Sequence, residues 1–216
     1  MTYVRKTVEN AAIGVAVLDG PTDFSPINRP GAAAAIWRRQ PPAGFTEWID
    51  NLPVNNLPSA RTIIGVENVQ HAVQAICENA QMPDTRERRF LISDVSILAE
   101  KFAKLMQTQF LRLRFDVVQD NACRKFHIDS VVARLVCTYR GLGTQYGISV
   151  DGYEPKRVFS VPTGSPMVLK GTEWPEPPMS GLLHRSPQIE GTGMTRLVLV
   201  LDPATEPVPE SRQTVH

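Results

Sequence analysis

Residues 110–118 read FLRLRFDVV and mark the point where the hydrophobic pattern of the chain changes. Apolar Leu111, Leu113 and Phe115 alternate with charged residues. Because successive side chains of a strand point to opposite faces, this period of two predicts a half-buried strand. Six more short strand candidates follow, with Gly, Pro and Ser turns and no helix between them: 126–139, 145–150, 157–161, 166–170, 181–185 and 195–202. About seven short strands of this kind predict an antiparallel sandwich or jelly roll.

The pattern before residue 110 is helical. No proline falls between Asp84 and Glu154, so long regular elements can form in this window. Apolar stripes with helical spacing predict amphipathic helices over 66–80 and 85–107. Asp84 or Thr85 can cap the second helix, because a short polar side chain there accepts a hydrogen bond from a free backbone N–H group. The fold class expected is therefore α+β, a jelly roll with supporting N-terminal helices.

The length of 216 residues is that of a single domain. Residues 32–37 (AAAAIW) are compatible with a short strand or a helical turn, and residues 45–52 place their apolar side chains on one helical face. The N-terminal arm is expected to supply the eighth strand of a jelly roll. We expect an irregular arm, a mainly helical support region, a jelly-roll metal-binding core and a disordered tail, over 1–31, 32–108, 109–202 and 203–216.

Composition excludes several classes of protein. Lys and Arg number 23 against 22 Asp and Glu, a net charge of +1, which argues against a nucleic-acid binder. No apolar stretch approaches the 18 residues or more of a membrane-spanning helix, and the N-terminus has no signal-peptide pattern. Three widely spaced cysteines argue against a disulfide framework. We expect a cytoplasmic protein that acts on a small molecule, with its oligomeric state left open.

The candidate metal ligands are two of the four histidines and one aspartate. His127 and Asp129 stand two positions apart, and residues i and i+2 of a strand point to the same side. His184 ends another predicted strand and can supply the third ligand. Two histidines and one carboxylate form the facial triad of non-haem Fe(II) oxygenases, which leaves coordination positions open. The alternative is a histidine at a strand end hydrogen-bonded to an aspartate in a turn.

Two arginines lie in strands too apolar to hold an unpaired charge without a large free-energy cost. Arg196, beyond His184, can bind a small dicarboxylate through its two parallel N–H groups, or can form an internal ion pair with Asp202 or Asp129. Arg134 can bind the carboxylate instead, or can hold Asp129 in place. Counted along a regular strand, Arg134 has the opposite parity to His127, which favours Arg196 as the carboxylate ligand.

Three further residues are candidates near this site. The hydroxyl groups of Thr138 and Tyr139 can donate to a co-substrate, and Tyr139 shares the parity of His127; a core tyrosine with a backbone partner is the alternative. If Cys123 joined the three ligands, the mixed thiolate site would suit Zn²⁺ better than Fe(II). The alternative for Cys123 is a small buried hydrophobic side chain.

The pattern of His127, Asp129, His184 and Arg196 resembles that of the Fe(II)/2-oxoglutarate dioxygenases, which have a cupin-like double-stranded β-helix. More closely, several segments resemble a bacterial family labelled only as a domain of unknown function. These segments are FHID at 126–129, TYRGLGT at 138–144, VPTGS at 161–165, HRSP at 184–187 and GTGMTRL at 191–197.

The first resemblance implies an oxygenase of the hydroxylase type. It implies that His127, Asp129 and His184 bind Fe(II), and that Arg196 holds the far carboxylate of 2-oxoglutarate. The second resemblance implies homology but names no reaction. Its members are often encoded near zinc-homeostasis genes, which implies the alternative of a non-catalytic zinc-binding protein with a cupin-like fold.

Overall fold

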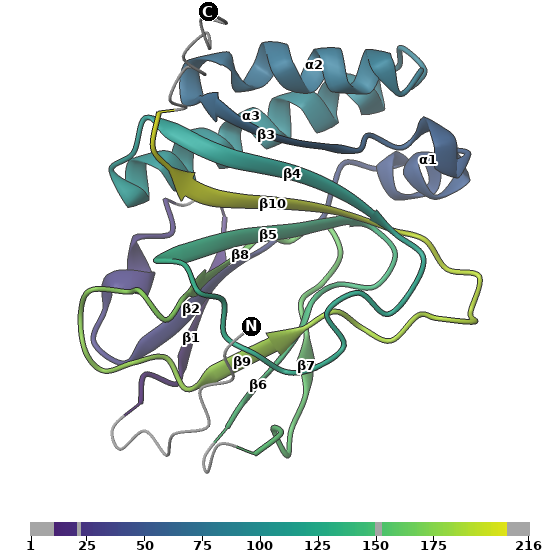
Figure 1. Cartoon of the computed structure of the whole chain (residues 1–216). Coiled ribbons are helices and arrows are strands. Elements are labelled where there is room, and N and C mark those ends of the chain that lie inside the picture. Colours follow the sequence, from purple (N-terminus) through teal and green to yellow (C-terminus); the bar gives the residue numbers. More distant parts are fainter. Residues whose placement is uncertain (1–10, 21–22, 150–152, 207–216) are drawn as a thin grey trace, which may run out of the picture.

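The computed structural model describes residues 11–20, 23–149 and 153–206, and its strands form two sheets (Figure 1). The large sheet has seven strands in the order β1-β2-β8-β5-β10-β4-β3, and the small sheet has three in the order β7-β6-β9. Among the described strands, β1 and β2 pair in parallel and the other strand pairs are antiparallel. The strands are β1 Gly14–Asp19, β2 Ala32–Arg38, β3 Ala60–Gly65, β4 Phe110–Val118, β5 Ala133–Arg140, β6 Gln145–Ile148, β7 Phe159–Ser160, β8 Met167–Lys170, β9 Leu182–Arg185 and β10 Arg196–Ala204.

The helices lie on the face of the large sheet away from the small sheet (Figure 1). They are α1 Phe45–Asn51, α2 Val69–Asn79 and α3 Arg86–Met106, with short 3-10 turns at Ser25–Asn28, Val54–Asn56 and Val66–Asn68. Helix α3 begins after Thr85, whose side chain accepts a hydrogen bond from the backbone N–H of Arg88. This confirms one of the two capping residues that the sequence suggested.

The alternation of side chains along the central strands creates two cores. On β10, Leu197, Leu199 and Leu201 belong to the core beneath the helices. Val198 and Val200, between them, belong to a second core that includes residues of the small sheet. One strand therefore serves both layers, because its successive side chains point to opposite faces. The second layer is the one that contains the candidate site.

Most predicted elements are confirmed. The strand predicted over 110–118 is β4, and the two long predicted helices correspond to α2 and α3. The N-terminal arm supplies β1, and residues 32–37 form a strand rather than a helical turn. Strand β3 was not predicted, although its sequence ARTIIG is rich in β-branched residues.

Two predicted boundaries differ from those in the structure. The strand predicted over 126–139 begins only at Ala133, so residues 126–132 are not part of it. The predicted tail starts at residue 203, but β10 continues to Ala204, and residues 207–216 lie outside the described part of the chain, as do residues 1–10 of the arm. Within the described residues, no helix is long and apolar enough to cross a membrane.

Candidate metal centre

Backbone hydrogen bonds place the two candidate histidines directly opposite each other. His127 donates its backbone N–H to the carbonyl of His184 at 3.1 Å, and His184 donates to the carbonyl of His127 at 3.0 Å. This is an isolated antiparallel bridge between His127 and strand β9. Directly opposed residues of an antiparallel pair project their side chains to the same face. The two imidazole rings accordingly lie 4.5 Å apart between centroids.

Asp129 lies in a loop that the end of β8 holds in place. The backbone N–H of Gly171 donates to Val132 at 2.9 Å, and that of Thr172 donates to the carbonyl of Asp129 at 2.9 Å. A Cβ atom on Gly171 would lie 1.8 Å from the carbonyl oxygen of Val131. Position 171 therefore requires glycine, because any side chain would push the loop that carries Asp129 out of place.

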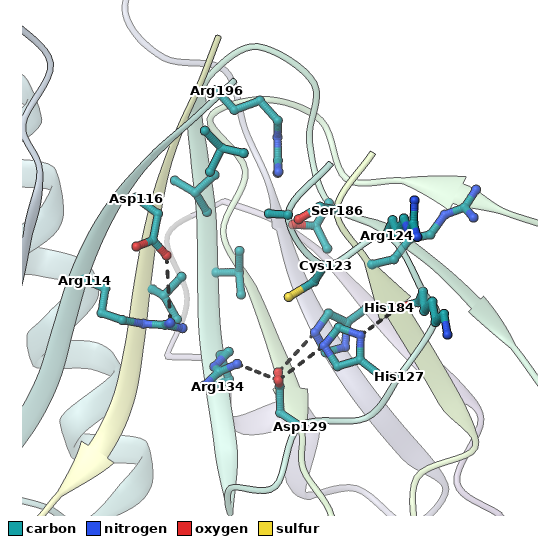
Figure 2. A pocket seen from close by; sticks show the side chains of 18 of the residues that line it. Arg114, Asp116, Cys123, Arg124, His127, Asp129, Arg134, His184, Ser186 and Arg196 are labelled. Carbon is teal, nitrogen blue, oxygen red and sulfur yellow. Dashed lines mark hydrogen bonds and ion pairs between the residues drawn. The ribbon is translucent and has the colours of Figure 1, made fainter. Parts of the chain in front are cut away.

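The three candidate ligands converge on one point, as Figure 2 shows. Nε2 of His127 is 3.5 Å from Oδ1 of Asp129, and Nε2 of His184 is 3.1 Å from Oδ2. One ligand atom from each residue lies within 4.8 Å of the others. Two atoms each about 2.1 Å from a shared ion lie about 3.0 Å apart at a right angle and about 3.4 Å apart at a tetrahedral angle. The two nitrogen-to-oxygen separations are close to these values, with each histidine facing a different oxygen of Asp129.

The hydrogen bonds around the cluster also fit a metal ion. Nδ1 of His127 lies 2.9 Å from the carbonyl oxygen of Lys125, which can only accept, so Nδ1 carries the proton and neutral His127 presents a bare Nε2. Oδ2 of Asp129 is buried, and apart from Nε2 of His184 at 3.1 Å no group of the described chain can donate a hydrogen bond to it. The bare nitrogen of His127 and the buried carboxylate oxygen of Asp129 face the same point, which a divalent cation would occupy favourably.

The charges of the cluster suit a cation as well. Burial alone would raise the pKa of Asp129, but His127, His184 and Arg134 together hold that pKa well below its usual range. Burial lowers the pKa of His184, and the neighbouring Asp129 carboxylate raises the pKa of His127. At neutral pH the site therefore contains an ionised carboxylate and a neutral His184. A metal ion would compete with a proton for His127.

Arg134 forms an ion pair with Asp129 and is not available to bind the carboxylate of a co-substrate. Its Nη1 is 2.6 Å from Oδ1 of Asp129, while Nε and Nη2 form a two-point ion pair with Asp202 at 2.6 and 2.8 Å. The parity argument against Arg134 was wrong, because residues 127–132 are not strand and the count begins anew at Ala133. Arg134 does point toward the site, but its guanidinium group is already occupied by two carboxylates.

Because the alternation of side chains starts at Ala133, the expectation that Tyr139 faces the same side as His127 is also wrong. Its side chain lies on the opposite face of β5, in the core under the helices, and is fully buried. Its hydroxyl donates to Oδ2 of Asp94 at 2.6 Å, and Asp94 also binds Arg39 through both oxygens. Burial, and then the charge of Asp94, raise the pKa of Tyr139 well above its usual value, so the hydroxyl remains a donor. Tyr139 is therefore part of a buried network away from the metal ligands.

A Tyr139→Phe variant is expected to lose stability without losing metal affinity. Removing a hydrogen bond to a buried charged group should lower the free energy of unfolding by about 1.5–3 kcal/mol. Urea denaturation and a metal titration on the same protein measure the two effects. Unchanged stability together with weaker metal binding would contradict this placement of Tyr139.

Arg196 and Thr138 lie on the face of the sheet that contains the candidate ligands. Arg196 is only 2% exposed, and its Nε donates to the carbonyl of Leu142 at 2.7 Å and its Nη2 to the hydroxyl of Thr138 at 3.3 Å. Among the described residues it has no carboxylate partner; the internal ion pair considered for it is formed by Arg134 instead. Burial lowers the pKa of Arg196 to about 10, so the group remains a cation at neutral pH.

One cavity of about 690 Å³ joins these groups (Figure 2). His127, Asp129, His184 and Arg196 all line it. Its volume lies within the range of roughly 300–1,000 Å³ that is usual for small-molecule sites. Cys123 also lines the cavity, but it is exposed rather than buried and its sulfur is outside the ligand cluster. The mixed thiolate site considered for zinc is therefore not formed.

Arg114 and Asp116 are charged lining residues that were not proposed from the sequence. Arg114 and Asp116 project into the cavity from β4. The signal was present in the alternation of FLRLRFDVV, but the charged positions of a half-buried strand are normally exposed to solvent. Here two of these positions line a cavity, in which the Arg114 side chain is 19% exposed.

Fold and site together define a protein of two mainly antiparallel sheets with a candidate metal centre between them. The fold is similar to that of dioxygenase for auxin oxidation 1 from Arabidopsis thaliana, solved in complex with 2-oxoglutarate, with a TM-score of 0.52 and 11% identity over 90% of this chain and 94% of that one. It is also similar to the rice dioxygenase for auxin oxidation, with a TM-score of 0.51 and 12% identity over 88% of this chain and 83% of that one.

The sequence itself gives the family. Residues 19–202 match the family model described as "Protein of unknown function (DUF1826)", and the chain belongs to this family. None of the curated proteins compared with the sequence matches it. At 11–12% identity, the two plant dioxygenases establish a shared fold but not a shared reaction.

Proposed function

We propose that the protein is a non-haem Fe(II)- and 2-oxoglutarate-dependent oxygenase of the hydroxylase type, acting on a small molecule. One observation carries the proposal: a cluster of two histidines and one carboxylate shares a cavity with a buried arginine that has no carboxylate partner among the described residues. This donor set is typical of Fe(II) oxygenases. The guanidinium group of Arg196, which has no carboxylate partner among the described residues, is suited to a dicarboxylate co-substrate.

The arrangement of the strands supports the finer description of the fold. The candidate ligands lie between a large and a small sheet whose pairs are antiparallel apart from one at the edge. We interpret these facing sheets as a cupin-like double-stranded β-helix, supported on its outer face by α1–α3. The likeness to a plant dioxygenase solved with 2-oxoglutarate supports this interpretation.

In this proposal, His127, Asp129 and His184 would hold the iron and leave coordination positions open. Bound iron would allow O₂ to oxidise both 2-oxoglutarate, which becomes succinate and CO₂, and a substrate C–H bond, which becomes C–OH, with one oxygen atom of O₂ going to each product. Arg134 keeps Oδ1 of Asp129 occupied, so that Oδ2 remains for the metal. Arg196 would neutralise the far carboxylate of 2-oxoglutarate. The Thr138 hydroxyl accepts a hydrogen bond from Arg196 and would fix the orientation of the guanidinium group.

The test is an anaerobic titration of the Fe(II)-loaded protein with 2-oxoglutarate, followed by its weak visible charge-transfer absorption. The wild type is expected to show the band, and His127→Ala is expected to lose it. Arg196→Met should raise the Kd for 2-oxoglutarate by about 30-fold or more, since truncating one partner of a buried charge pair commonly costs 2 kcal/mol or more. Its metal affinity should not change.

Arg140→Met is the matched control. Arg140 lies on β5 but donates to the carbonyl of Leu52 instead of lining the cavity, so its loss should leave the 2-oxoglutarate affinity unchanged. Tight, stoichiometric zinc with no effect of 2-oxoglutarate would contradict the oxygenase and support the non-catalytic zinc-binding alternative.

A further inference from the structure

The cavity around the candidate metal centre is strongly basic. Two acidic side chains line it, Asp116 and Asp129. The basic side chains that line it are Arg114, Arg124, Lys125, Arg134, Arg185 and Arg196. Because the chain as a whole carries a net charge of only +1, this excess is a local property of the cavity. A concave surface of one sign concentrates ligands of the opposite sign.

Two of the arginines already have a role. Arg134 is bound to Asp129 and Asp202, and Arg196 is the proposed ligand of the co-substrate. One dianionic co-substrate therefore accounts for Arg196 but not for Arg114, which lies on a different strand.

Arg114 lines the cavity with its charge poorly compensated. Its side chain is 19% exposed, and the nearest acidic oxygen that pairs with it, Oδ2 of Asp116, is 3.9 Å from its Nη1, at the outer limit of an ion pair. Asp116 itself is 38% exposed, so water weakens this contact. Nε of Arg114 is buried, and no group of the described chain accepts its hydrogen. Buried polar groups are nearly always hydrogen-bonded, so this N–H lacks the acceptor that a ligand can supply.

Three valines line the cavity between Arg114 and the metal ligands, together with Arg134, whose guanidinium group is already paired with Asp129 and Asp202. On the neighbouring strand β10, Val200 lies opposite Arg114, and on β5 Val136 lies opposite Val200. Val198 extends this surface toward Arg196, and all three valines line the cavity. Strands lie about 4.8 Å apart, so Arg114 is roughly 10 Å from the strand that follows the Asp129 loop. A ligand can therefore place an acid group on Arg114 and an apolar body over the valines.

We propose that the primary substrate is an organic anion, a carboxylate or a phosphate ester, and that Arg114 binds its acid group. The proposal rests on the function proposed above, since it names the substrate class of the same site. Arg114 binds the acid through its planar pair of N–H groups, and the apolar part of the substrate lies on Val136, Val198 and Val200 with one carbon facing the metal. Arg196 remains with the co-substrate.

The test uses the full chain loaded with zinc, which permits binding without turnover, and saturated with 2-oxoglutarate. The probes are butanoate, hexanoate, benzoate and phenyl phosphate by calorimetry, with butanamide, hexanamide and benzamide as uncharged counterparts of the three carboxylates. At least one anion is expected to bind ten times more tightly than the amides. Arg114→Gln should weaken that anion tenfold or more while leaving the affinities for zinc and 2-oxoglutarate unchanged. Asp116→Asn, which removes the nearby negative charge, should bind the anion as well as wild type or better.

Three results would overturn the proposal: no anion of the panel binds, acids and amides bind equally, or Arg114→Gln binds the anion like wild type. Failure of the oxygenase function is seen separately, as wild-type zinc protein that does not bind 2-oxoglutarate. In that case the same titration on Arg196→Met without 2-oxoglutarate still tests Arg114, because the other candidate anion site has been removed.

Discussion

The Asp129→Ala variant is expected to lose its affinity for Fe(II) or Zn²⁺ by at least about 100-fold. Even the loss of groups that only orient a metal ligand commonly weakens binding 10- to 100-fold, and Asp129 supplies the only carboxylate of the cluster. The two remaining imidazoles carry no negative charge to offset the nearby Arg134. Competition with a chromogenic chelator measures the change, with the wild type as reference.

The same variant should still fold, because Arg134 keeps its two-point ion pair with Asp202. Asp116→Asn is the control, since Asp116 lines the same cavity but lies outside the cluster, and it should bind metal like the wild type. Wild-type metal affinity in Asp129→Ala would mean that the ligands are other groups, and the proposed centre would have to be abandoned.

Arg134→Met is expected to give the largest loss of stability, about 3–5 kcal/mol in the free energy of unfolding of the metal-free protein. The change leaves Asp129 and Asp202 buried without their cation, and breaking a buried ion pair from one side commonly costs this much. Methionine fills a similar volume, so the effect is mainly that of the unpaired charges. Urea denaturation, with the slope of the transition compared between variants, measures it.

A double-mutant cycle gives the control. In an Asp202→Asn background, Arg134→Met leaves one fewer uncompensated carboxylate, so it should be clearly less destabilising than in the wild type. Distant, independent sites add within roughly 0.5 kcal/mol. Effects that add to within this margin would show that Arg134 and Asp202 do not act as a pair, contrary to the ion pair at 2.6 Å.

Local signals predicted most of the regular elements. The alternation in 110–118 gave β4 with its observed bounds, and the helical stripes gave α2 and α3 within a few residues. These elements follow from patterns of neighbouring residues, such as the period of side-chain burial and the capping side chain of Thr85. Strand β3 lies at an edge of the large sheet and pairs only with β4, and its short sequence gave no alternating pattern from which to predict it.

For the candidate site, the sequence predicted which residues take part but not how all of them are oriented. His127, Asp129, His184 and Arg196 were named from residue types that metal and carboxylate chemistry require, and the structure brings them into one cavity. The orientation of residues on β5 was predicted wrongly, because parity was counted through residues 127–132 as if they were strand. A loop resets that count, and nothing in the local pattern of this segment reveals where a strand begins.

The sequence by itself determined most kinds of element, the two faces of the strand at 110–118 and the set of residues able to hold a metal, because these depend on side-chain chemistry and on short-range periodicity. Only the tertiary structure decided which groups are partners. The bridge between His127 and His184 and the ion pair between Arg134 and Asp202 join residues far apart in the chain. The weak compensation of the Arg114 charge likewise follows from its position in the folded protein. Such contacts are set by sheet order and register, which no local pattern encodes.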